Sequence, residues 1–383
     1  SWASLRPPPR PPSLPPNSSD RPKPTPSVRV ASWPSCATPG SPEPQRRRRP
    51  RWWGGQPRYA DGSDLHLKRS TCLNTSWNNQ RSKRATYFAD VKHQFNDDWS
   101  LKVAGVYSRN TQDMEYSFPS GTVPLGATAT NTLMLGSTYD YDQRDYGFDA
   151  YVDGKFDAFG QQHELIVGAN ASRSHKDDFY AVAALPQRQN VFNPNHNIPQ
   201  PDESYYLANA SRGGPVDMHI KQYGAYSIAR LKLADPMTLV LGSRVSWYKS
   251  DTDSVQYFRG EGTEVNTQST ETGQVTPFAG LLYDLNDNLT AYASYTDIFT
   301  PQGSYKTIDG STLKPLIGQS YELGIKGEWF DGRLNTTFNL FRTIQKDAAQ
   351  DDLRCEDSSC QINSGKVRAQ GFEAEVSGEV IER

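Results

Sequence analysis

The chain has 383 residues, a formal net charge of −2, 22% charged residues and 35% hydrophobic residues. No apolar run approaches the ~18 residues of a membrane-spanning helix, which excludes a helical membrane protein. The same composition does not exclude a transmembrane β-barrel, because barrel strands expose only alternate residues to lipid and are therefore half polar.

Residues 1–57 differ from the rest of the chain. They hold most of the prolines and four consecutive arginines at 46–49, against two acidic residues, Asp20 and Glu43. Such a segment buries too little apolar surface to offset its ordering entropy, so we predict a disordered Pro/Arg-rich segment without a secretory signal. A flexible tail or an out-of-frame translation explains this composition better than a segment that binds nucleic acid or anionic lipid. We interpret it as non-native, with native sequence starting near Arg58.

From residue 58 onward, apolar and polar residues alternate with the period of two that is typical of β-strands. In the clearest case Tyr146, Phe148 and Val152 share one face, whereas Asp149 and Asp153 share the other. About eleven strands are predicted, at residues 85–95, 99–114, 145–156, 163–173, 223–233, 239–247, 275–285, 289–299, 321–330, 334–344 and 367–376.

The connections between these strands alternate between tight turns and long polar loops. The tight turns, rich in Asp, Asn and Gly, lie at 96–98, 157–160, 235–236, 286–288 and 331–332. Outer-membrane barrels place short turns on one side and long loops on the other. A soluble β-sandwich, the alternative, has no reason to keep this asymmetry, and its strands are usually shorter. We therefore predict an all-β fold, a transmembrane antiparallel β-barrel over 58–383 with lipid outside and a wet lumen.

Several segments resemble the TonB-dependent siderophore receptors of Gram-negative outer membranes. The sequences Ala-Tyr-Ala-Ser-Tyr-Thr-Asp-Ile-Phe-Thr-Pro-Gln at 291–302 and Tyr-Glu-Leu-Gly-Ile-Lys-Gly-Glu at 321–328 carry most of the likeness. Haem receptors of that superfamily have Arg-Ala-Pro near Pro301, which this chain lacks. The likeness continues at 313–320 and 331–335. The segments 86–99, 191–195 and 367–373 also resemble this family, particularly its receptors for ferric hydroxamate and pyoverdine-type siderophores.

The resemblance implies a 22-stranded barrel with an N-terminal plug and a TonB box that contacts TonB. It also implies an outer-membrane location, lipid as surroundings, and a ferric siderophore as transported ligand, with no other cofactor and no enzyme activity. About half of such a barrel is expected in this chain, which shows neither plug nor TonB box. The alternatives are a non-functional truncated receptor product and, less favoured, an outer-membrane barrel enzyme, for which we find no Ser/His/acid cluster.

Candidate sites follow from residue type. A bulky, partly apolar ferric chelate is gripped by aromatic stacking and a few hydrogen bonds. No metal site is predicted, because the six histidines include no pair at i,i+2 or i,i+4, and acidic pairs such as Asp177-Asp178 are interpreted as solvated loop charge. Cys355 and Cys360 can form a local disulfide or remain thiols, and Cys72 is expected to be unpaired. The ligand-binding candidates are Tyr116, Phe118, Tyr180, Phe192, Tyr205, Tyr206, Tyr257 and Tyr305.

Overall fold

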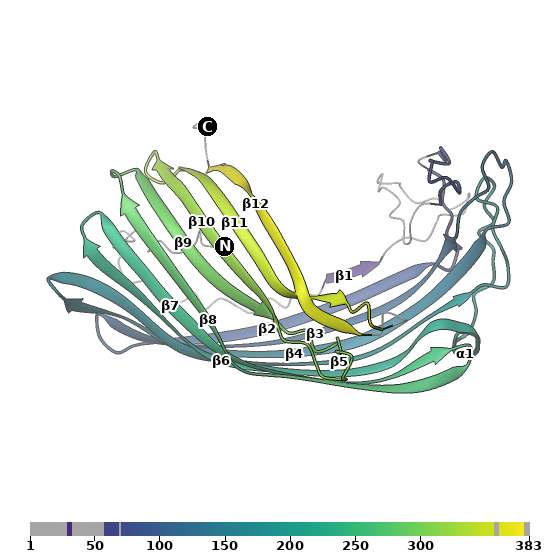
Figure 1. Cartoon of the computed structure of the whole chain (residues 1–383), viewed down its shortest axis with the longest axis horizontal. Coiled ribbons are helices and arrows are strands. Elements are labelled where there is room, and N and C mark those ends of the chain that lie inside the picture. The colour runs from purple at the N-terminus through teal and green to yellow at the C-terminus, as the bar shows by residue number, and fades with distance from the viewer. Residues whose placement is uncertain (1–28, 33–56, 69, 356–359, 379–383) are drawn as a thin grey trace, which may run out of the picture.

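The computed structural model describes residues 29–32, 57–68, 70–355 and 360–378. These residues form one antiparallel sheet in which every strand pairs with its neighbours in sequence, in the order β1 to β12. Figure 1 shows this sheet as a long curved wall. The elements are β1 (Arg29–Ser32), β2 (Asn79–Gln94), β3 (Trp99–Ser120), β4 (Leu133–Ala158), β5 (Gln161–Ala184), α1 (Glu203–Asn209), β6 (Ala210–Ala234), β7 (Met237–Phe258), β8 (Glu261–Asp284), β9 (Leu289–Thr300), β10 (Leu316–Trp329), β11 (Leu334–Asp351) and β12 (Gln361–Gly378).

One face of the wall, named the lipid face below, exposes large apolar side chains. Leu281, Leu323 and Phe372 belong to a single row that crosses β8 to β12, and each is at least 41% exposed. A water-soluble protein does not expose so continuous an apolar surface, whereas a membrane barrel requires one. The predicted all-β barrel wall is therefore confirmed. No helix among the described residues is long and apolar enough to cross a membrane.

The opposite face, named the lumen face, carries a polar network. The Tyr226 hydroxyl donates to Asp149 Oδ1 at 3.0 Å, and Arg244 Nη2 donates to Asn170 Oδ1 at 2.8 Å. These contacts join β4, β5, β6 and β7 side by side. Hydrogen bonds to the charged Asp149 and Arg244 offset the cost of leaving such groups without a partner, and the sequence alternation predicts polar residues on this face.

Aromatic rings mark one boundary of the lipid face. Tyr107 and Tyr146 lie 5.0 Å apart between ring centroids, and Tyr223 stacks on Trp247 at 5.5 Å. Aromatic girdles of this kind lie at the membrane interface of outer-membrane barrels. We name the set the aromatic belt; it consists of Tyr87, Tyr107, Tyr146, Tyr223, Trp247, Tyr295 and Tyr321.

All five predicted tight turns are confirmed, and their sequences explain their geometry. Asn96 Oδ1 accepts hydrogen bonds from the amides of Asp98 and Trp99, at 3.0 and 2.8 Å. Asn286 repeats the arrangement in its own turn, with distances of 2.9 and 3.0 Å. An Asn side chain that imitates a backbone turn is a recognised signal for a tight connection.

The long connections are shorter than predicted, because most strands continue beyond the aromatic belt. The largest difference lies between β7 and β8, where the predicted long loop is a hairpin closed by Arg259 and Gly260, both at positive φ. Asp177 and Asp178, interpreted from the sequence as loop charge, lie within β5. Beyond the membrane both faces of a strand are polar, so the alternation used to detect strands disappears there while the backbone pairing continues.

The N-terminal segment contributes one short strand. Most of residues 1–57 lies outside the described residues, but β1 pairs antiparallel with β2 over four residues. At these four residues the structure has an edge strand where the sequence predicts disorder. The reason is that β2 presents an unpaired backbone edge, which even a short extended segment can satisfy.

Cys355 and Cys360 form a disulfide, with Cα atoms 6.1 Å apart. Cys72 is also disulfide-bonded, which corrects the expectation that it is unpaired.

We expect replacement of Cys355 and Cys360 by serine to lower the free energy of unfolding by about 2 kcal/mol, the loop-closure entropy of so short a loop. Hydrogen exchange should speed up at 352–355 and 360–363 and stay unchanged in β9; equal protection in variant and wild type would contradict this.

Candidate functional site: an aromatic pocket on the lumen face

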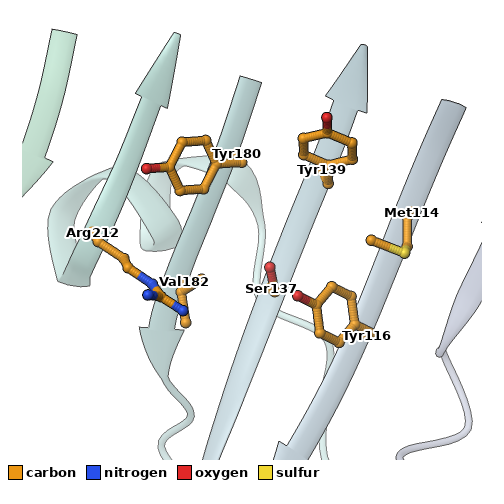
Figure 2. A pocket seen from close by; sticks show the side chains of 7 residues that line it. All are labelled: Met114, Tyr116, Ser137, Tyr139, Tyr180, Val182 and Arg212. Carbon is orange, nitrogen blue, oxygen red and sulfur yellow. The ribbon is translucent and has the colours of Figure 1, made fainter. Parts of the chain in front are cut away.

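Seven side chains from four neighbouring strands line a pocket of about 300 Å³. Figure 2 shows them projecting from β3, β4, β5 and β6. The pocket lies on the lumen face, beyond the aromatic belt and close to the ends of the strands that lead into the long connections. Its lining consists of Met114, Tyr116, Ser137, Tyr139, Tyr180, Val182 and Arg212.

Strand register explains why these residues meet. Met114, Tyr139 and Tyr180 are direct partners across β3, β4 and β5, so they form one row. Tyr116 lies two residues beyond Met114 on β3 and opens a second, parallel row through Ser137 and Val182 that ends at Arg212 on β6. Since the side chains at i and i+2 of a strand share a face, both rows point into the lumen.

Two glycines allow β6 to approach its neighbours beside the pocket. A Cβ on Gly213 would lie 2.2 Å from the Tyr180 carbonyl oxygen, and one on Gly214 would lie 1.7 Å from the Val255 carbonyl oxygen. Both glycines have positive φ, near +140° and +145°. The strand pairing also shifts register between Val182 and Ala183. Irregularities of this kind re-aim side chains near functional sites, and here Arg212 is the residue so placed.

The pocket combines π faces with a guanidinium group. Tyr116, Tyr139 and Tyr180 supply three phenol rings, which stack on flat, partly apolar groups and offer hydroxyls for hydrogen bonds. Within the described part of the chain Arg212 has no ion-pair partner, so its guanidinium is available to a carboxylate or hydroxamate oxygen. The arrangement suits a bulky organic ligand with aromatic and anionic parts.

A charged pair lies next to the pocket on β5. Lys176 forms an ion pair with Asp178, and its Nζ lies 5.8 Å from the ring centroid of Tyr139 and 5.7 Å from that of Tyr141. Asp178 is 7% exposed, and its Oδ1 has no hydrogen-bond partner among the described residues. Buried acceptors normally have a partner, so this oxygen is available to an N–H or O–H donor.

The structure separates the sequence candidates into groups. Tyr116 and Tyr180 line the pocket, and Phe118 stacks on Tyr116 with ring centroids 5.7 Å apart. Phe192 packs instead against a loop core formed by Leu65, Leu73, Val123 and Val191. Ligand binding by these residues stays a prediction. Their positions at the pocket favour Tyr116, Tyr180 and Phe118 over Phe192.

Three further candidates lie away from the pocket. Tyr257 belongs to β7 close to the β7–β8 turn, and strand alternation puts it on the side opposite to the lumen face. Tyr305 is 45% exposed in the connection between β9 and β10. Tyr206 is 3% exposed and packs on Ala181 and Ala183, behind the pocket wall.

The short helix α1, which the sequence analysis missed, positions Tyr205 and Tyr206. Asp202 caps it by accepting from the Tyr205 amide at 2.8 Å, and this hydrogen bond holds the pKa of Asp202 below its ordinary value. The Tyr205 hydroxyl donates to the Ala184 carbonyl at 2.7 Å. Burial raises the pKa of Tyr206, so its phenol stays protonated.

We expect Tyr206→Ala to loosen α1 without removing the pocket, because the ring packs behind the wall and not inside it. Hydrogen exchange at 203–209 should accelerate at least severalfold, whereas the affinity for a ligand of the pocket should fall less than for Tyr180→Ala. Tyr205→Phe, which loses only the bond to Ala184, is the matched control. A larger affinity loss in Tyr206→Ala than in Tyr180→Ala would contradict this placement.

Sequence reasoning missed Ser137, Tyr139 and Arg212, because all three fall in stretches interpreted as loop. A local signal was available at 137–141, where Ser137, Tyr139 and Tyr141 alternate with Thr138 and Asp140. Both sets are polar or aromatic, so hydrophobicity alone does not reveal the strand.

Comparison with known proteins agrees with this architecture. A family model described as TonB dependent receptor-like, beta-barrel matches residues 37–380. The chain is 92% identical over 331 residues to the ferric-pyoverdine M114 receptor PbuA of Pseudomonas sp. (strain M114), covering 86% of this chain and 40% of that relative. It is 31% identical over 346 residues to the ferripyoverdine receptor of Pseudomonas aeruginosa, covering 86% and 39%. The chain thus spans about 40% of the length of these relatives.

Solved structures show the same similarity. The P. aeruginosa receptor FpvA bound to heterologous pyoverdines superposes with a TM-score of 0.72 at 30% identity, covering 86% of this chain and 43% of that one. The ferripyoverdine receptor bound to ferripyoverdine gives a TM-score of 0.70 at 29% identity, covering 85% and 42%. Such receptors are outer-membrane proteins of Gram-negative bacteria, which fits the lipid face described above. The chain belongs to the TonB-dependent receptor β-barrel family.

Proposed function

We propose that this chain forms part of the barrel wall of an outer-membrane receptor. The receptor takes up a ferric siderophore of the pyoverdine type in a TonB-dependent manner. The observation that carries the proposal is the pocket of tyrosines and one arginine on the lumen face, where the wall extends beyond the aromatic belt. A ligand that enters from the long-loop side meets this pocket before it reaches the membrane-spanning part of the lumen. The strong identity to a ferric-pyoverdine receptor supports the same ligand class.

The proposed role is binding and passage, not a reaction. The relatives are receptors, and the seven described residues that line the pocket supply three phenols, one guanidinium and one hydroxyl, with no base among them beside a nucleophile. Energy for transport would come through TonB, the partner that the family resemblance implies. A wall of this kind contributes ligand contacts and a polar passage, which the lumen-face network provides.

The test uses the longest product of the gene, expressed in a bacterial strain that lacks its own pyoverdine receptors. We expect accumulation of iron-55 supplied as ferric pyoverdine, and loss of this accumulation when the proton-motive force is dissipated. Equilibrium binding to isolated outer membranes should persist without that force. No binding above that of the receptor-less strain would overturn the ligand assignment, whereas binding with energy-independent uptake would overturn the TonB assignment.

A further inference from the structure

Two histidines and one aspartate meet on the lipid-face side of the wall, beyond the aromatic belt. His175 lies on β5, and Asp217 and His219 lie on β6. Their candidate ligand atoms all lie within 4.8 Å of one another. No metal site is expected from the sequence, because no two histidines lie at i,i+2 or i,i+4. In the structure the pair forms across strands, through the register that places His175 opposite His219.

The geometry resembles that of a metal-ligand set. Nε2 of His175 and Nε2 of His219 each lie 3.1 Å from the same oxygen, Oδ1 of Asp217. Ligand atoms around a tetrahedral ion with bonds of about 2.0–2.1 Å are separated by about 3.3 Å. The two imidazole rings stack at 4.1 Å between centroids with 12° between their planes, so both nitrogens point the same way. Small side-chain shifts would therefore accommodate an ion.

The surroundings favour a cation at this position. Asp217 is flanked on the same face by Asp177 of β5 and Asp253 of β7, its direct strand partners. The facing cations are Arg144, Arg173, Lys221 and Lys249, of which Arg144 is paired with Asp142 and Lys249 with Asp251. Stacked histidines beside three carboxylates thus present imidazole nitrogens and carboxylate oxygens to an incoming ion.

A second observation concerns which ring nitrogen of His219 faces the cluster. Nδ1 of His219 is buried and has no hydrogen-bond partner among the described residues. The polar contact that the structure gives this ring is made through Nε2, on the side where the three ligand atoms converge. Both histidines thus direct Nε2 toward Asp217, because His175 also contacts Asp217 through Nε2.

We propose that His175, Asp217 and His219 form a binding site for a divalent transition-metal ion, of which Zn²⁺ is the best fit. Two imidazoles and one carboxylate are a borderline ligand set that suits Zn²⁺ and excludes Ca²⁺ and Mg²⁺, which prefer oxygen ligands. Three protein ligands leave a fourth position for water. The ion would join β5 and β6 outside the membrane, and the site is independent of the lumen-face pocket.

The experiment measures metal binding by the longest product of the gene, purified in detergent and treated with a chelator. Isothermal titration with Zn²⁺ should show one saturable site, and Co²⁺ should give the visible absorption of a tetrahedral complex. His175→Gln or His219→Gln should weaken Zn²⁺ binding by at least about tenfold, equivalent to about 1.4 kcal/mol. Asp177→Asn and His93→Gln, which remove a flanking charge and a distant histidine, should change affinity far less.

The outcomes separate a site from a simple hydrogen-bonded cluster. Absence of saturable Zn²⁺ binding, or equal affinity in wild type, His175→Gln and His219→Gln, would overturn the proposal. Ferric-siderophore binding in the same variants serves as the folding check, because the site lies on the face opposite to the pocket. Retained siderophore binding with lost Zn²⁺ binding supports the proposal, and loss of Zn²⁺ binding in His93→Gln to the same degree contradicts it.

Discussion

Replacement of Tyr180 by alanine is expected to weaken ferric-siderophore binding by about 2 kcal/mol, roughly thirtyfold, the size of a hot-spot aromatic contact. Tyr180 lies in the row with Met114 and Tyr139, and its ring forms part of the pocket lining. Removing it opens the pocket on the β5 side and deletes one stacking surface. The measurement is equilibrium binding of radiolabelled ferric pyoverdine to outer membranes that contain equal amounts of receptor.

Tyr257→Ala is the matched control for this substitution. It also removes a tyrosine side chain, but from the side of the wall opposite to the lumen face, where the pocket lies. Its affinity should remain within about twofold of wild type, as expected for a contact worth less than 0.5 kcal/mol. Arg212→Gln should weaken binding and also reduce its dependence on salt, because the guanidinium would no longer attract an anionic ligand. Equal losses in Tyr180→Ala and Tyr257→Ala would show that the pocket is not the binding site.

Phe338→Arg is expected to destabilise the inserted barrel by about 2–4 kcal/mol, the cost of an Arg at the bilayer midplane on the lipid-facing side of a strand. Phe338 is 49% exposed, pairs across strands with Ile325 and contacts Phe372 at 6.3 Å between ring centroids. Its partner Ile325 lies further along β10 than Tyr321 of the aromatic belt, so we expect lipid around the Phe338 side chain. Urea titration in phospholipid vesicles measures the change.

Thr337→Arg provides a close control, since it changes the next residue along β11 but faces the lumen. Thr337 pairs with Lys326, which already carries a charge on that face. A lumen-facing arginine remains hydrated, so we expect its effect on the free energy of unfolding to be below about 1 kcal/mol. If the two variants were destabilised equally, the assignment of lipid and lumen faces on β11 would be wrong.

Much of the fold could be predicted from the sequence where lipid imposes a period of two. The strand containing Tyr146, Phe148 and Val152 shows this clearly, because alternate residues meet a membrane on one side and water on the other. The turns at Asn96 and Asn286 were equally readable, since one side chain supplies the hydrogen bonds that close each turn. In both cases the cause acts within a few residues.

The candidate site was less predictable because its causes are not local. Tyr116 and Tyr180 were identified by residue type, but their partners Tyr139 and Arg212 lie in strand extensions where neither face meets lipid. The family-like segment 291–302 gave no physical reason for its final Gln302. In the structure this buried side chain donates to the Lys314 and Asp347 carbonyls, both at 2.7 Å, and so ties a loop to β11.

Histidine pairing across strands was also invisible to a search within segments. His175 and His219 are separated by a long connection that contains α1, and only the register of β5 with β6 brings them together. Register depends on the whole length of both strands and on the bulge near Val182.

The β7–β8 hairpin has a consequence for attack by proteases at the cell surface. A protease needs a segment that it can draw into its cleft in extended form. Here β7 and β8 pair with each other up to Phe258 and Glu261, which leaves only Arg259 and Gly260 in the turn. The connections at 121–132 and 301–315, which lack such pairing over most of their length, offer that freedom. The parts of the wall that extend furthest in regular strands should thus survive digestion as large fragments, with the cuts falling where the sheet gives way to loops.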